Sequence, residues 1–177
     1  MKNLQNAASR VAALEGSMLV IDPSSGGTSK RGEKSCAGWA TFFEGKLIGS
    51  GILEYPSEKV VFKRLKTLRR YVTDFFDGDL YELFVLEDIR GYRAQQSLIQ
   101  SCGVYITSID FEEFFQINVK TWKSIAKQWV GYVKSDENDA VYMGYAAVAI
   151  ALGYNSKLKP DKRMEIIEKA KGVVGYE

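Results

Sequence analysis

The chain has 177 residues, of which 46% are hydrophobic, and its formal net charge is only +2. This length and composition fit one compact domain with its own core, and no run approaches the roughly 20 apolar residues of a membrane helix, so we expect no membrane partner. The chain contains no histidine, which excludes Ser-His and Cys-His catalysis and any His-ligated zinc or iron site, so the acid–base and metal chemistry of an enzyme would rest mainly on Asp, Glu and Lys.

The first sixteen residues, MKNLQNAASRVAALEG, are expected to form an N-terminal arm or a short helix. They lack the long apolar core and the cleavage site of a signal peptide. Residues 17–177 are expected to form a single folded domain. The two cysteines, Cys36 and Cys102, are not spaced as a metal pair and suit a reducing compartment, so we expect a cytoplasmic protein.

Short apolar runs predict the first part of a sheet. Residues 17–21 (SMLVI) form a buried strand that ends at Asp22-Pro23, and a polar, Gly-rich loop follows. GWATFFEG and KLIGSGILEY are two strands joined by a turn at residues 44–46. Ser57 is expected to cap a helix that extends over residues 57–76.

Helices and strands are then expected to alternate. Residues 81–86 (YELFVL) form a buried strand that ends in Glu87. The remaining predicted elements are a helix over 94–102, a strand over 104–109, and helices over 119–130, 136–152 and 161–171. A hairpin meander followed by alternating elements indicates an α/β fold with a mixed sheet and helices on its faces.

The predicted helix over residues 136–152 begins with the acidic stretch SDENDA. Capping is one interpretation, because Asp and Asn favour helix N-caps and negative charge suits the first helical turn. Asp136 and Asp139, however, are three residues apart and share the apolar helix face that continues through Met143 and Ile150. That placement favours carboxylates that face the core.

Two further carboxylates follow buried strands. Taken alone, Asp22 fits a turn aspartate before proline, and Glu87 fits a surface acid at a strand end. If the two strands are adjacent and parallel, the carboxylates meet at the edge where sites collect, and Asp136 and Asp139 can pack against them. Such an all-oxygen cage selects Mg²⁺ or Mn²⁺, and a pair of these ions suits phosphodiester hydrolysis.

These motifs resemble those of the RuvC-like Holliday junction resolvases of the ribonuclease H-like superfamily. Asp22-Pro23 resembles the family's first catalytic aspartate, and LFVLED resembles its strand ending in the catalytic glutamate. KSDENDA resembles its closing K-x-D-x-x-D-A motif, whose two aspartates bind metal. AQQSLIQSCGV and INVKTWK resemble the helix after the glutamate and the lysine segment. The resemblance covers roughly residues 17 to 153.

The resemblance implies a ribonuclease H-like fold, a mixed five-stranded sheet with helices on both faces. It implies a Mg²⁺-dependent endonuclease, with two ions for which Mn²⁺ can substitute, that resolves four-way DNA junctions by paired symmetric nicks as a homodimer. The implied metal ligands and catalytic residues are Asp22, Glu87, Asp136 and Asp139. The family's glycine after Asp-Pro is Ser24 here, and Arg90 stands where the family often has an aromatic residue. These departures suit a compact, phage-type enzyme, which would act in the host cytoplasm.

Basic residues are the candidates for DNA contacts. Lys120 best matches the family's catalytic lysine, and the second basic residue is either Lys123 or Lys127. The full set of expected DNA-binding residues is Lys30, Arg31, Lys34, Arg90, Tyr92, Arg93, Lys123 and Lys127. For the first three, a phosphate grip and a solvated loop fit equally well, whereas Arg90 and Arg93 lead into a helix N-terminus, a natural anion site.

Two other functions fit the same residues. One is a terminase-type or general branched-DNA nuclease of the same fold, although no ATPase domain of a full terminase is expected in this sequence. The other is an inactive DNA-binding scaffold protein, against which the presence of all four acids argues.

Overall fold

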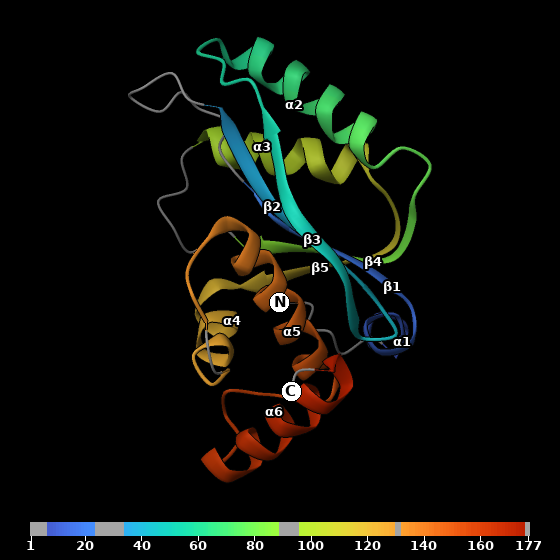
Figure 1. The fold of residues 1–177 in the computed structure, drawn as a ribbon, viewed down its shortest axis with the longest axis vertical. Helices are drawn as coiled ribbons and strands as arrows, with labels where there is room; N and C mark the ends of the chain where they lie inside the picture. Colours follow the sequence, from blue (N-terminus) through green and yellow to red (C-terminus); the bar gives the residue numbers. More distant parts are fainter. Residues whose placement is uncertain (1–6, 24–33, 89–95, 130–131, 176–177) are drawn as a thin grey trace.

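A computed structural model describes residues 7–23, 34–88, 96–129 and 132–175. Within these ranges the elements are α1 (Ala7–Glu15), β1 (Ser17–Asp22), β2 (Ser35–Phe43), β3 (Lys46–Tyr55), α2 (Val61–Phe75), β4 (Leu80–Asp88), α3 (Gln96–Ser108), β5 (Asp110–Asn118), α4 (Val119–Ala126), α5 (Asp136–Ala151) and α6 (Pro160–Val174) (Figure 1). None of the helices in this described part has both the length and the apolar character needed to span a membrane.

The strands form one mixed sheet in the order β3-β2-β1-β4-β5. The neighbours β1–β2 and β2–β3 are antiparallel, whereas β1–β4 and β4–β5 are parallel. Glu44 and Gly45 both have positive φ, 50° and 73°, as a tight two-residue hairpin turn between β2 and β3 requires. The predicted five-stranded mixed sheet is confirmed.

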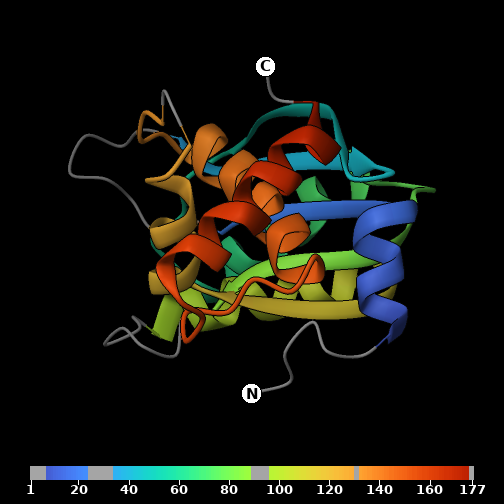
Figure 2. The ribbon, with the colours of Figure 1, turned by 90° about the horizontal axis from the view of Figure 1, so that it is seen from below.

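Each face of the sheet has its own hydrophobic core. Successive side chains of a strand point to opposite faces, so Met18 and Val20 of β1 pack with α1, α4, α5 and α6, whereas Leu19 and Ile21 pack with α2 and α3. In Figure 2, α5 and α6 cross in front of the strands, with α1 and α4 at opposite ends of the sheet. Helices on both faces, as predicted, complete the fold class.

The strand predicted over residues 104–109 is wrong. These residues belong to the end of α3 and the turn after it, and the fifth strand is β5. Cys102 and Tyr105 are buried at helical spacing, and this packing outweighs the strand-like composition of VYITSI. β5 is paired on one side only, at the sheet edge, which accommodates its exposed Asp110 and Glu112.

The predicted cap at Ser57 is also wrong. α2 begins at Val61, and its N-cap residue, Val60, makes no side-chain capping bond. The Ser57 hydroxyl instead shares a 2.9 Å hydrogen bond with the Ser35 hydroxyl at the start of β2. The buried face of α2 consists of Arg64, Leu68 and Val72.

Candidate active site

Parallel pairing of β1 with β4 brings two of the predicted carboxylates together at the C-terminal ends of these inner strands. Ile21 is paired with Leu86, so Asp22 and Glu87 follow at neighbouring strand ends. The condition on which their meeting depended, that the two strands are adjacent and parallel, is therefore met. Both side chains are half-buried.

The start of α5 packs against β2 beside Asp22. Gly38 of β2 is the pairing partner of Asp22, and a β-carbon at Gly38 would collide with the main-chain carbonyl oxygen of Asp136. Only glycine permits two backbones to approach this closely. Gly38 thus sets how near Asp136 lies to Asp22.

The capping interpretation of the acidic stretch does not explain Asp139. Ser135 is the N-cap of α5, and its hydroxyl accepts a 3.1 Å hydrogen bond from the backbone N–H of Asn138. Asp139 is only 5% exposed, on the helix face directed at the core, whereas Asp136 is exposed at the helix start. The neighbouring Glu137 points elsewhere, since it accepts a 2.8 Å hydrogen bond from the Ser50 hydroxyl of β3.

Asp22 lies at the electrostatic centre of the group. Burial is the largest cause of a pKa well above its ordinary value, and the negative charges of Glu87, Asp139 and Asp136 raise the pKa further. Lys123 of α4 partly offsets them. The charges of the other three predicted carboxylates therefore reach Asp22.

Glu87 is held by a donor from α4. Its Oε1 accepts a 3.1 Å hydrogen bond from the indole N–H of Trp122. Burial raises the pKa of Glu87, the Trp122 bond and the charge of Lys123 lower it, and Asp139 and Asp88 raise it again. Lys123 therefore acts on both strand-end carboxylates.

Each of the two helix carboxylates also accepts a hydrogen bond. The Tyr132 hydroxyl donates to Oδ1 of Asp139 at 2.7 Å, and the Cys36 thiol donates to Oδ2 of Asp136 at 3.0 Å. Burial and this bond raise the pKa of the Cys36 thiol to about 11, so the thiol remains a protonated donor at neutral pH.

The predicted basic residues are only partly placed. Lys30, Arg31, Arg90, Tyr92 and Arg93 lie outside the described residues. Lys34 is exposed and pairs with Glu54 at 2.7 Å, an exposed contact that contributes little to stability. Lys120 and Lys127 are exposed, whereas Lys123 is half-buried near Asp22 and Glu87.

The donor set suits a hard divalent cation, because four carboxylates supply only oxygen ligands and excess negative charge. In the ranges that the structure describes, no three or more His, Cys, Asp or Glu side chains are grouped closely enough to hold a metal ion. The donors Trp122, Tyr132 and Cys36 each contact one oxygen of a carboxylate. A cation shared by all four carboxylates would draw them closer together than they stand here.

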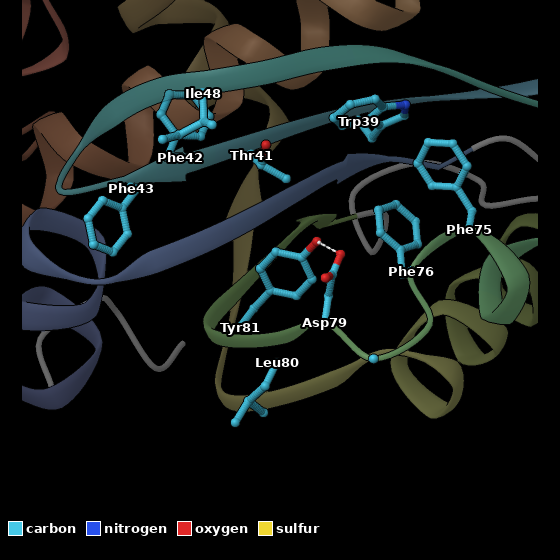
Figure 3. A pocket seen from close by; sticks show the side chains of 11 residues that line it. Trp39, Thr41, Phe42, Phe43, Ile48, Phe75, Phe76, Asp79, Leu80 and Tyr81 are labelled. Atoms are coloured by element: carbon cyan, nitrogen blue, oxygen red, sulfur yellow. Dashed lines mark hydrogen bonds between the residues drawn. The ribbon is translucent and has the colours of Figure 1, made fainter.

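A cavity of about 480 Å³ lies between the β2–β3 hairpin and the C-terminal end of α2, and none of the four candidate carboxylates lines it (Figure 3). Its lining is largely aromatic and includes Trp39 and Phe75. The carboxylate in it, Asp79, accepts a 2.9 Å hydrogen bond from Tyr81. None of the predicted site residues lines this cavity. The candidate site is therefore the group of carboxylates at the C-terminal ends of β1 and β4.

The raised pKa of Asp22 predicts how stability depends on pH in the metal-free protein. Folded Asp22 binds a proton more tightly than unfolded Asp22, whose pKa is near 3.8. Stability is therefore fully present below that value and is lost as pH rises toward the folded pKa. We expect the unfolding free energy of wild type minus that of Asp22→Asn, from urea unfolding in EDTA, to fall as pH rises from 4 to 7. A difference that rises instead would contradict the raised pKa.

Gly38→Ala should disrupt the site. The new methyl group meets backbone atoms of Asp136, which no side-chain rotation relieves, so the start of α5 must shift away from Asp22. We expect a loss of about 1–3 kcal/mol in urea unfolding and loss of the DNA cleavage that the sequence predicts. Gly49→Ala is the matched control in the same hairpin, because its methyl group would meet Thr41 and Trp39 at ordinary contact distances of 3.5–3.7 Å. Equal activity of the two variants would show that Gly38 does not position Asp136.

No protein-family model matches the chain, and no curated protein matches it. Similar solved structures include T. thermophilus RuvC in complex with a Holliday junction substrate, with 12% identity, a TM-score of 0.49, and coverage of 76% of this chain and 94% of that chain. A second Thermus thermophilus RuvC structure has 11% identity, a TM-score of 0.42, and coverage of 90% and 97%.

RNase H1 from the halophilic archaeon Halobacterium salinarum has 10% identity, a TM-score of 0.33, and coverage of 59% of this chain and 87% of that chain. Identities this low concern the fold alone, and TM-scores below 0.5 carry no argument about activity. The fold class, a mixed five-stranded sheet with helices on both faces, rests on the strand order and pairing of the chain itself.

Proposed function

We propose that this protein is a metal-dependent endodeoxyribonuclease whose site consists of Asp22, Glu87, Asp136 and Asp139. The observation that carries the proposal is the meeting of Asp22 and Glu87 at the neighbouring C-terminal ends of β1 and β4, with the start of α5, which bears Asp136 and Asp139, packed against β2 beside them. Burial and the charges of Glu87, Asp139 and Asp136 raise the pKa of Asp22, so its charged form is costly unless a cation neutralises it. The site is thus suited to hold positive charge.

The four carboxylates would hold Mg²⁺ or Mn²⁺, which supplies Lewis-acid stabilisation of the negative charge that develops on a phosphodiester. Lys123 adds a fixed positive charge beside Asp22 and Glu87 and would contact a phosphate oxygen there. Lys120, exposed at the start of α4, remains the predicted catalytic lysine by its place in the motif. Because the chain has no histidine, the proton of the attacking water would pass to solvent water, and a protonated lysine such as Lys120 would donate a proton to the leaving oxygen.

The substrate we propose is a four-way DNA junction. The support is the sequence resemblance to RuvC-like resolvases, in particular the motif KSDENDA at the start of α5. Resolution needs two symmetric nicks, so a homodimer with two-fold symmetry would match the two-fold substrate.

The second candidate is a general branched-DNA nuclease with the same four carboxylates. Arg90 favours it, because the RuvC-like family often has an aromatic residue at that position. An inactive DNA-binding scaffold is the non-enzymatic alternative.

Nicking of labelled four-way junction, flap and linear duplex at equal length and physiological salt separates these functions. With Mg²⁺ we expect paired, symmetric nicks in the junction and little cleavage of linear duplex, and with EDTA we expect none. Equal nicking of all three substrates would leave the general nuclease. Binding without cleavage would leave the scaffold, and full activity in EDTA would overturn the metal-dependent site.

A further inference from the structure

We propose that Trp122 and Tyr132 form an aromatic pair that positions Glu87 and Asp139 for cation binding. The inference rests on the proposed function, and it assigns a role to two residues that themselves contact neither cation nor substrate. Both donate a hydrogen bond to a site carboxylate, and their rings contact each other.

Trp122 links α4 to the end of β4. Its side chain is fully buried, and its indole N–H donates to Oε1 of Glu87 at 3.1 Å. A buried indole N–H normally has a hydrogen-bond partner, and here the partner is a candidate metal ligand rather than a main-chain carbonyl. Lys123 lies over the same ring, with its Nζ 4.9 Å from the centroid. Trp122 therefore restrains the orientation of Glu87 and also contacts Lys123, whose charge reaches Asp22 and Glu87.

Tyr132 makes the corresponding link to α5. Its hydroxyl donates to Oδ1 of Asp139 at 2.7 Å, a short hydrogen bond to a buried carboxylate. Its ring meets that of Trp122 edge-on, with centroids 6.5 Å apart and planes at 84°, and packs edge-on against Tyr142 at 4.9 Å. Glu87 of β4 and Asp139 of α5 thus each accept a hydrogen bond from one of two aromatic side chains that contact each other.

The geometry of these bonds suits positioning. Each donor contacts a single oxygen of its carboxylate, which restricts rotation of the carboxyl group while the other oxygen is not taken up by that bond. Partners that orient metal ligands in this way typically contribute about 10- to 100-fold to metal affinity or activity. Without them the carboxylates would rotate and repel one another.

Trp122→Phe and Tyr132→Phe test the pair, because each keeps a ring and removes only the donor. We expect each variant to weaken Mn²⁺ binding to the metal-free full-length protein by about 10-fold or more in calorimetry. On junction DNA with Mg²⁺ we expect a lower kcat and an unchanged KM. Because the two donors act through one ring contact, the double variant should lose less than the product of the single losses.

Two matched controls separate positioning from packing. Trp129→Phe alters a tryptophan of the same core cluster, stacked on Tyr145 at 5.4 Å, and Tyr81→Phe removes a 2.9 Å tyrosine–aspartate bond remote from the site. Both should change the melting temperature while keeping Mn²⁺ affinity within about twofold of wild type.

Unchanged Mn²⁺ affinity and kcat in both Trp122→Phe and Tyr132→Phe, whatever their melting temperatures, would overturn the inference and leave the pair as core packing. Failure of the proposed function looks different, because the wild-type protein itself would then bind no Mn²⁺ and cut no DNA. Should Trp122→Phe not fold, Tyr132→Phe alone decides between positioning and packing.

Discussion

Asp22→Asn is expected to abolish cleavage while leaving the metal-free protein as stable as wild type or more stable. Asp22 lies at the end of β1, among three other carboxylates, and both burial and their charges raise its pKa. Asparagine has nearly the same shape but no charge, so it removes repulsion from the folded state together with a metal ligand. Activity should fall by more than about 100-fold. Removing a residue that only orients a metal ligand typically lowers activity by up to about 100-fold, so a larger loss indicates that Asp22 is itself a ligand.

The two readouts for Asp22→Asn are junction nicking in Mg²⁺ and urea unfolding in EDTA. The combination of lost activity and retained stability is diagnostic, because a residue kept for packing or capping would show the reverse. A variant that unfolds well before wild type and still cuts DNA would mean that Asp22 is a structural turn residue.

Divalent cations are expected to stabilise the folded protein strongly. A ligand that binds only the folded state at 100 times its Kd adds about 2.7 kcal/mol, which corresponds to roughly 5–10 °C in Tm for a chain of this size. We expect Mg²⁺ and Mn²⁺ to raise the Tm measured after removal of metal with EDTA, and Ca²⁺ to do so with little cleavage, because it tolerates looser coordination.

The control for cation stabilisation compares the cation-induced rise in Tm between variants of two acidic residues in the first turn of α5, Asp139 and Glu137. Asp139→Asn should lose most of the cation-induced rise in Tm, whereas Glu137→Gln should keep it, because Glu137 bonds to Ser50 of β3 rather than facing the site. An equal rise in all three proteins would mean that the cations bind elsewhere.

Much of the candidate site could be predicted because its sequence signals are local. Asp22 and Glu87 each follow an apolar run that ends abruptly in an acid, and such runs become buried parallel strands whose ends share an edge. Asp136 and Asp139 share a helix face through their spacing alone. The strand over residues 104–109 was wrong because its composition suits a strand and its spacing suits a helix, and packing against α2 decided between them.

The supporting contacts were not predictable, because they join residues far apart in the chain. Cys36 and Asp136 are 100 residues apart, and Trp122 and Glu87 are 35 apart. No local pattern marks Gly38 as the position where α5 meets β2. The choice between Lys123 and Lys127 was also open in the sequence, and α4 directs the charge of Lys123 at the carboxylates while Lys127 is exposed.

Single-turnover cleavage of a four-way junction, started by adding Mg²⁺ to metal-free protein, tests the carboxylate site most directly when wild type, Asp139→Asn and Glu137→Gln are compared. We predict that wild type and Glu137→Gln cut the junction at similar rates, and that Asp139→Asn binds the junction without cutting it. Cleavage by Asp139→Asn at the wild-type rate, or cleavage by wild type before Mg²⁺ is added, would contradict a cation site built from Asp22, Glu87, Asp136 and Asp139.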